Sequence, residues 1–145
     1  MYRLIYKSRS KRQIDWEMVT QIMDHSSASN EEHDITGLLL ATNTHFFQIL
    51  EGRFHDVNDI FIRIARDDRH ENINLISFQV IDKRLFSGWG MRGIGVFNFN
   101  KEIERDLMEK YGKEEGSVRF PLEDWMGLAL VNDIRMIGNQ PDWTS

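Results

Sequence analysis

Two side chains of this 145-residue sequence can each donate and accept a hydrogen bond at positions where a core residue is expected. Gln48 stands between Phe46 and Leu50 in an alternating apolar segment, which places all three on one face of a strand. A buried amide needs partners, because leaving it unsatisfied costs about 1–3 kcal/mol. Tyr6, in a second alternating segment, carries a phenol that also donates and accepts. The pattern alone favours a hydrogen bond that merely satisfies both groups over a functional pair.

The segments that carry these residues belong to a regular succession of strands and helices. Apolar alternation and apolar runs predict five strands, at residues 2–8, 35–41, 45–51, 72–81 and 89–97. Helical spacing predicts one helix that begins after Asp15 as its N-cap and fades near residues 26–30, and a second helix over residues 57–64. The order β-α-β-β-α-β-β predicts an α+β, ferredoxin-like sandwich with both helices on one face of the sheet.

The other face of the predicted sheet is also apolar, so another part of the chain must cover it. Five side chains are expected to point to it: Ile5, Leu38, Leu40, Phe47 and Ile49. Apolar residues at helical spacing in segments 103–111 and 122–131 predict two further helices that can provide this cover. We therefore expect a domain over residues 1–99 and a C-terminal helical extension over residues 100–145, of which residues 140–145 form a loose tail.

Charge and hydropathy limit the classes of partner. With 18 basic and 23 acidic residues, the net charge of -5 argues against a general nucleic-acid binder. The densest basic stretch, residues 7–12, is interpreted as a solvated loop after the first strand. No run approaches the ~18 apolar residues of a membrane span, and the N-terminus lacks the apolar core of a signal peptide. A cytoplasmic protein that binds neither membrane nor nucleic acid is expected.

Several kinds of chemistry are excluded or disfavoured by residue type and spacing. The sequence has no cysteine, which excludes a disulfide scaffold, a thiolate metal site and a cysteine nucleophile. Its 5 histidines show no metal-ligand spacing. Residues 88–93 match the spelling G-x-G-x-x-G, but that motif binds a dinucleotide only where a helix begins within it. Strand-like residues follow here, so we reject this segment as a dinucleotide-binding motif.

Five segments, in order, resemble the BLUF family of blue-light photoreceptors. They are RLIYKS at residues 3–8, ITGLLL at 35–40, FFQILEG at 46–52, DDRH at 67–70, and Phe86 followed by WGM at 89–91. The resemblance implies the ferredoxin-like fold already expected, with the isoalloxazine ring of a non-covalently bound flavin between the two helices. It implies FAD as the usual cofactor of the family and does not exclude FMN.

The resemblance also implies roles for individual residues. Tyr6 is implied to be the electron donor to the excited flavin, and Gln48 to lie between that phenol and the flavin N5 and C4 carbonyl. Asn30 is implied to bond the carbonyl and imide edge of the ring. Trp89 and Met91 are implied to be the mobile residues of the fifth strand that report the change. An amide suits this switch because it both donates and accepts, whereas an ionised glutamate only accepts.

The remaining flavin contacts that the resemblance implies come from the two helices, their ends and one strand: Ile22, Ser26, Phe46, Ile64, Asp67, Arg69 and His70. Without a flavin, the apolar members of this set are ordinary core residues and the charged members are a solvated helix end. We expect at least one of the three residues at the end of the second helix to contact the ring edge or the ribityl-phosphate chain.

The resulting hypothesis is a non-enzymatic photoreceptor whose Tyr-Gln-flavin switch is relayed to a partner protein or to a change in oligomeric state. Too few residues follow the predicted sheet for a cyclase or phosphodiesterase domain. Two alternatives from other classes stay open. One is a flavin-binding redox protein in which light is incidental, and the other is a flavin-free protein interaction module that retains the fold.

Overall fold

The computed structural model describes residues 1–88 and 90–137 of the chain. Its first seven helices and strands follow the predicted order, and further elements come after them. The elements are β1 (Tyr2–Ser10), α1 (Trp16–Glu32), β2 (Thr36–Ala41), β3 (His45–Gly52), α2 (Phe54–Arg66), β4 (His70–Val80), β5 (Met91–Gly95), the 3-10 turn η1 (Val96–Asn98), α3 (Lys101–Tyr111), β6 (Lys113–Glu114), β7 (Ser117–Val118) and α4 (Asp124–Ile137).

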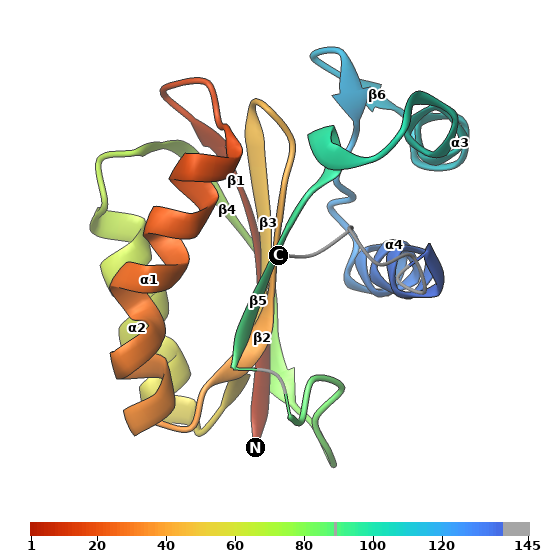
Figure 1. The fold of residues 1–145 in the computed structure, drawn as a ribbon. Coiled ribbons are helices and arrows are strands. Elements are labelled where there is room, and N and C mark those ends of the chain that lie inside the picture. Colours follow the sequence, from red (N-terminus) through yellow and green to blue (C-terminus); the bar gives the residue numbers. More distant parts are fainter. Residues whose placement is uncertain (89, 138–145) are drawn as a thin grey trace.

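A five-stranded sheet in the order β4-β1-β3-β2-β5 forms the centre of the molecule. Neighbouring strands are antiparallel except for β2 and β5, which are parallel. Helices α1 and α2 cover one face of the sheet, and α3 and α4 lie on the other face (Figure 1). The predicted ferredoxin-like α+β sandwich, with both early helices on one face, is therefore confirmed.

The first helix begins where the sequence predicts but extends further. The side chain of Asp15 accepts a hydrogen bond from the backbone N–H of Met18, which is the expected N-cap. The predicted fading near residues 26–30 is wrong, because the helix continues to Glu32. The hydroxyl of Ser26 donates to the carbonyls of Ile22 and Met23 one turn earlier, so the serines find partners inside the helix instead of ending it.

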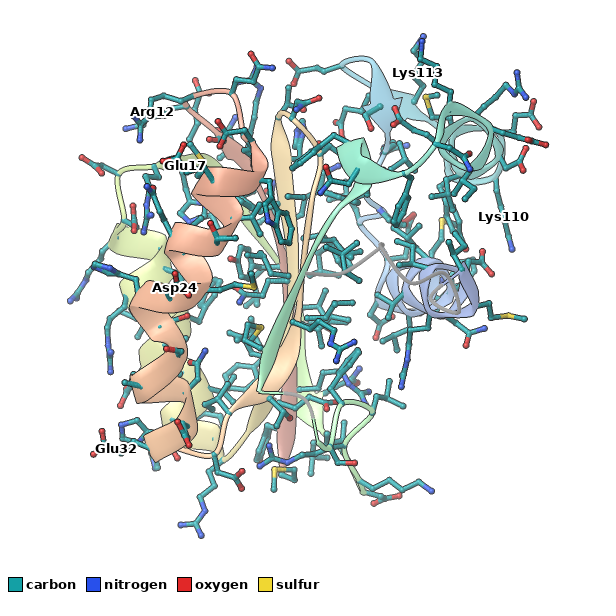
Figure 2. All side chains as sticks on the ribbon, in the orientation of Figure 1. Arg12, Glu17, Asp24, Glu32, Lys110 and Lys113 are labelled. Carbon is teal, nitrogen blue, oxygen red and sulfur yellow. The ribbon has the colours of Figure 1, made fainter. Side chains whose placement is uncertain are left out.

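The face of the sheet opposite α1 and α2 is covered by the C-terminal extension, as predicted. Its five apolar side chains join one continuous core with residues of α3 and α4. At Gly127 of α4, an added Cβ would lie 2.5 Å from the ring of Phe47, so only glycine permits this close approach. Figure 2 shows side chains filling the space on both sides of the sheet, while charged residues such as Glu17 and Lys110 point outward.

Two features of the extension differ from the prediction. Helix α4 continues past residue 131 to Ile137, the last residue described, and the short sheet of β6 and β7 precedes it. The sequence did not predict this sheet, because two-residue strands are too short to show alternation. The expected loose tail at residues 140–145 lies outside the described residues. Within the described residues, no helix is both long and apolar enough to cross a bilayer.

The interpretation of residues 7–12 as a solvated loop is wrong for its first half, because β1 extends to Ser10. Lys7 is buried, and its ammonium group donates to Glu114 Oε1 and to the carbonyl of Phe120, both at 2.8 Å. Arg9 pairs with Glu115 in the same segment. These acidic partners lie more than a hundred residues later in the chain, so the basic stretch attaches the extension to the sheet.

The connection between β2 and β3 turns without a glycine. Thr42 Oγ1 accepts hydrogen bonds from the backbone N–H groups of Thr44 and His45. The side chain of Asn43 donates to the carbonyl of Ile14 at 2.9 Å. Side-chain hydrogen bonds therefore stabilise this three-residue loop, and the loop is also tied to the segment before α1.

Candidate functional site

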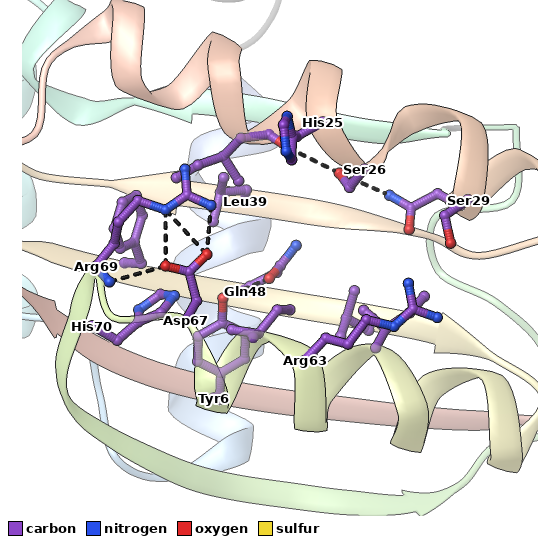
Figure 3. A pocket seen from close by; sticks show the side chains of 16 residues that line it. Tyr6, His25, Ser26, Ser29, Leu39, Gln48, Arg63, Asp67, Arg69 and His70 are labelled. Atoms are coloured by element: carbon purple, nitrogen blue, oxygen red, sulfur yellow. Dashed lines mark hydrogen bonds and ion pairs between the residues drawn. The ribbon is translucent and has the colours of Figure 1, made fainter.

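A pocket of about 210 Å³ opens between α1, α2 and the sheet. Figure 3 shows α1 and α2 on opposite sides of it, with Tyr6 and Gln48 close together on the strands between them. The pocket is lined by Tyr6 and by all nine side chains expected to contact a flavin: Ile22, Ser26, Asn30, Phe46, Gln48, Ile64, Asp67, Arg69 and His70. The fold thus brings the whole predicted set, apart from the two residues of the fifth strand, to one cavity.

Tyr6 and Gln48 are directly paired across β1 and β3. The phenol Oη of Tyr6 donates to Gln48 Oε1 over 2.6 Å, and both side chains are buried. Because the phenol occupies the amide oxygen, the NH2 group points away from it and meets Met91 Sδ at 3.5 Å. A thioether sulfur is a weak acceptor, so this second contact holds the amide only loosely. The amide of Gln48 is therefore firmly bonded on one side and weakly bonded on the other.

The phenol of Tyr6 stays protonated over the whole physiological range. Burial raises the pKa of this group far above its ordinary value, and the nearby carboxylate of Asp67 raises it further. The guanidinium of Arg69 opposes this rise but does not reverse it. A neutral phenol is a hydrogen-bond donor, which agrees with the direction of its bond to Gln48.

Asn30 presents an unused acceptor to the pocket. Its side chain is buried, and its Nδ2 lies 3.4 Å from Ser26 Oγ. Its Oδ1 has no hydrogen-bond partner among the described residues. A buried acceptor without a partner costs about 1–3 kcal/mol. This oxygen therefore indicates a bound molecule that offers an N–H or O–H group at this point.

The end of α2 brings charge to the pocket. The guanidinium of Arg69 chelates Asp67, with Nη2–Oδ2 at 2.6 Å and Nε–Oδ1 at 3.0 Å. These hydrogen bonds lower the pKa of Asp67 to about 2. Burial lowers the pKa of His70, whose Nδ1 lies 2.7 Å from Ser8 Oγ, so the imidazole is neutral. Arg63 adds a second guanidinium to the lining.

The two predicted residues of the fifth strand fall in different positions. Met91 begins β5 and contacts the amide of Gln48, although it does not line the pocket. Trp89 lies outside the described residues. The G-x-G-x-x-G spelling at residues 88–93 runs into a strand instead of a helix, which agrees with its rejection as a dinucleotide site. No three metal-ligating side chains gather within residues 1–88 and 90–137.

The sequence reasoning missed six residues of the lining: His25, Ser29, Leu39, Leu50, Ile60 and Arg63. Four of them could have been found from helical spacing. On α1, the pocket residues recur at positions 22, 25, 26, 29 and 30, and on α2 at positions 60, 63, 64 and 67. These intervals of three and four residues place them on one helix face.

Comparisons with known proteins identify the family of the chain. A family model described as "Sensors of blue-light using FAD" matches residues 1–92. The blue light- and temperature-regulated antirepressor BluF of Escherichia coli (strain K12) is 30% identical over 119 residues, which are 82% of this chain and 28% of that protein. The photoactivated adenylate cyclase subunit alpha of Euglena gracilis is 27% identical over 68% of this chain and 10% of its own length.

The chain thus spans between a tenth and about a quarter of the length of these two relatives. A solved structure matches over nearly its full length. BlrB, described as a BLUF protein in its dark state, superposes with a TM-score of 0.72 at 28% identity, covering 94% of this chain and 96% of that one. Since the family model covers most of the chain and the fold agrees, the chain belongs to the BLUF family of flavin-binding blue-light sensors.

Proposed function

We propose that Tyr6 and Gln48 are the light-responsive switch of this sensor and that residues 1–99 form its flavin-binding domain. The observation that carries this proposal is the 2.6 Å hydrogen bond from Tyr6 Oη to Gln48 Oε1. It lies against a pocket whose other walls are suited to a flavin. When the two ends of this amide exchange, little is lost on the side of Met91, because a thioether sulfur is a weak acceptor.

The lining fits a flavin in three respects. Ile22 of α1 and Ile64 of α2 offer apolar surfaces for a planar ring. Asn30 Oδ1 is an unpartnered acceptor that suits the N–H of the imide edge of the ring. Arg63 and Arg69 bring positive charge that suits a phosphate. We propose FAD as the cofactor and FMN as the alternative.

A flavin bound in this pocket and excited by blue light supplies a strong oxidant, able to take an electron and a proton from a nearby phenol. The protein's part lies in the hydrogen bonds of Gln48. While Tyr6 keeps its proton, the amide oxygen accepts from it. Once the phenol oxygen needs a donor instead, the amide must turn or tautomerise. Rotation replaces the NH2 group facing Met91 by an oxygen that the sulfur does not attract, whereas tautomerisation leaves a nitrogen there with one hydrogen fewer.

Rotation of the Gln48 amide changes the contact at the start of β5 from attractive to repulsive. The contact of Gln48 Nε2 with Met91 Sδ at 3.5 Å is weak but attractive, whereas an amide oxygen at the same place repels the sulfur lone pairs. Met91 is the first residue of the edge strand β5. We propose that displacement of Met91 carries the change out of the pocket, with Trp89 as a second mobile residue.

We further propose that the output leaves through the C-terminal extension, residues 100–145, to a partner protein or a second copy of the chain. Helix α4 exposes two large apolar side chains, Trp125 at 65% and Met136 at 72%. The relatives include an antirepressor and an adenylate cyclase, so the family acts on different effectors. We propose a sensor and not an enzyme, and a cytoplasmic location stays a prediction.

The experiment that tests the proposed cofactor chemistry is an absorption spectrum before, during and after blue illumination, with the bound flavin identified after release. We expect a flavin spectrum that shifts to the red in light and recovers in the dark. A spectrum that bleaches irreversibly would favour the redox alternative. If the protein binds no flavin, even after reconstitution, the flavin-free interaction module is the remaining alternative.

A further inference from the structure

Glu51 is a fully buried carboxylate that the switch does not use. It lies on β3, three residues after Gln48, and its side chain points to the opposite face of the sheet. Its Oε2 accepts from Arg3 Nε at 2.9 Å and from the backbone N–H of Leu85 at 3.1 Å. Its Oε1 accepts from the N–H of Phe86 at 3.0 Å. Each of its oxygens thus receives charge-assisted or backbone hydrogen bonds.

These hydrogen bonds fasten the connection between β4 and β5 to the middle of the sheet. In Figure 1 this connection runs on the side of the sheet that carries α4. The ring of Phe86 is buried in the core beneath α4. Arg84 adds three bonds, to Thr36 Oγ1 at 2.9 Å, to Asp34 Oδ2 at 3.1 Å and to the carbonyl of Glu51 at 3.4 Å. Residues 84–86 are therefore a fixed segment inside a surface connection.

The fixed segment 84–86 is near β5 in the chain and contacts α4. Five residues after Phe86, Met91 contacts the amide of Gln48. On the other side, Arg135 of α4 donates to the carbonyl of Leu85 at 3.4 Å, and its guanidinium lies 5.4 Å from the centre of the Phe86 ring. The same short segment therefore precedes, by five residues, the strand that reports the switch, and it contacts the helix of the extension.

We propose that Glu51 is a positioning residue of the photoswitch, which holds segment 84–86 so that movement of Met91 reaches Arg135 and α4. The inference rests on the proposed switch at Gln48. A segment held at two adjacent N–H groups moves as a unit, whereas a loose connection would absorb the displacement of β5. The two carboxylate oxygens divide the work, since Oε2 accepts from the N–H of Leu85 and Oε1 from that of Phe86, so loss of either acceptor frees one amide.

The first test measures whether Glu51 protects the backbone amides of Leu85 and Phe86, and it needs no light. In Glu51→Gln the side chain keeps its size, but its NH2 group replaces one acceptor and opposes one of the two N–H groups. Backbone hydrogen exchange at Leu85 and Phe86 should become about tenfold faster or more than in the unaltered protein. Glu114→Gln is the matched control, since Glu114 binds buried Lys7 on the same side of the sheet. Unchanged exchange at both amides in Glu51→Gln would overturn the proposal.

The second test measures transmission in the flavin-loaded protein. Illumination should change hydrogen exchange in α4 of the unaltered protein. In Glu51→Gln we expect this change to fall to less than about half, while the red shift of the flavin is kept. A full response of α4 in Glu51→Gln would overturn the proposal. If the unaltered protein shows no red shift, the proposed switch fails, and exchange at Leu85 and Phe86 still decides whether Glu51 holds the segment.

A second variant keeps the proposal testable if Glu51→Gln does not fold. Arg135 lies on the exposed side of α4, so Arg135→Met should leave the core intact. It should keep slow exchange at Leu85 and Phe86 and lose most of the light-induced change in α4. A full light response of α4 in Arg135→Met would overturn the proposed route.

Discussion

The two faces of the sheet differ in how completely they are packed. On the face covered by α3 and α4, apolar side chains form one continuous core, and the buried ammonium of Lys7 has two hydrogen-bond acceptors. On the face covered by α1 and α2, the core is divided into two clusters by a pocket. That pocket contains the unpartnered Asn30 Oδ1 and the amide of Gln48, whose NH2 group has only a weak acceptor.

The difference teaches that one sheet serves two purposes. Alternate residues of β3 point to opposite faces, so Phe47 and Ile49 stabilise the fold while Gln48 between them stays free to switch. Because the face under α3 and α4 is tightly packed, a structural change at Gln48 on the other face has few ways to spread through the sheet. The following predictions test this contrast, beginning with the largest expected effect.

The sharpest test of the contrast is a pair of neighbouring phenylalanines with the same burial. Phe47→Ala should reduce the free energy of unfolding by about 3–5 kcal/mol, because its ring packs against Phe120 and Gly127 with no space nearby. Phe46→Ala should reduce the free energy of unfolding by clearly less than Phe47→Ala, since part of the Phe46 ring borders the pocket. Urea unfolding of the flavin-free protein measures both. Equal losses would contradict the difference in packing.

The second prediction concerns the ion pair that attaches the extension. Lys7→Met leaves Glu114 Oε1 and the carbonyl of Phe120 without their donor. We expect a loss of about 1–3 kcal/mol in the free energy of unfolding. Lys113→Met, at an exposed lysine next to Glu114, is the control and should change stability by less than about 0.5 kcal/mol. If both variants lose the same amount, the buried ammonium group has no special role.

The third prediction separates stability from binding at the pocket. Asn30→Ala removes an acceptor that has no partner in the flavin-free protein, so its stability should stay the same or rise slightly. Flavin affinity should fall by about five- to tenfold, as for one lost hydrogen bond. Titration with flavin and urea unfolding measure the two effects. Unchanged affinity would show that Asn30 Oδ1 does not bind the ring.

The smallest expected effect is the pH dependence of the Asp67–Arg69 pair. The pKa of Asp67 is lowered to about 2 in the folded protein, below its unfolded value near 4. Its contribution is therefore complete above about pH 4 and is lost as the pH falls toward 2. Because the pair is partly solvated, Asp67→Asn should cost less than about 1 kcal/mol at pH 7. The difference between the two proteins should vanish near pH 2, and a difference that grows at low pH would contradict this sign.

The sequence predicted the parts of the fold that depend on local periodicity. Alternation around Gln48 and Tyr6 placed both on the helix-covered face, and Asp15 marked the start of α1. It did not predict that α1 passes through Ser26, because the hydroxyl can end a helix or bond within it with equal ease. Nor could it predict that Lys7 meets Glu114, since their pairing depends on the fold of the whole chain.

The candidate site was predicted to a similar extent. Spacing and family resemblance identified most, but not all, of the side chains that line the pocket. They did not identify the chelation of Asp67 by Arg69 or the hold of Glu51 on Leu85 and Phe86. Both depend on hydrogen bonds whose geometry is fixed only after the strands and loops have packed.

The measurement that tests the central claim most directly is the light-minus-dark absorption spectrum of Gln48→Leu. Leucine keeps the bulk of the side chain and removes both the donor and the acceptor, so the variant should bind flavin and show no red shift. Gln21→Leu, at an exposed glutamine of α1, should shift like the unaltered protein. A normal, reversible red shift in Gln48→Leu would contradict the account.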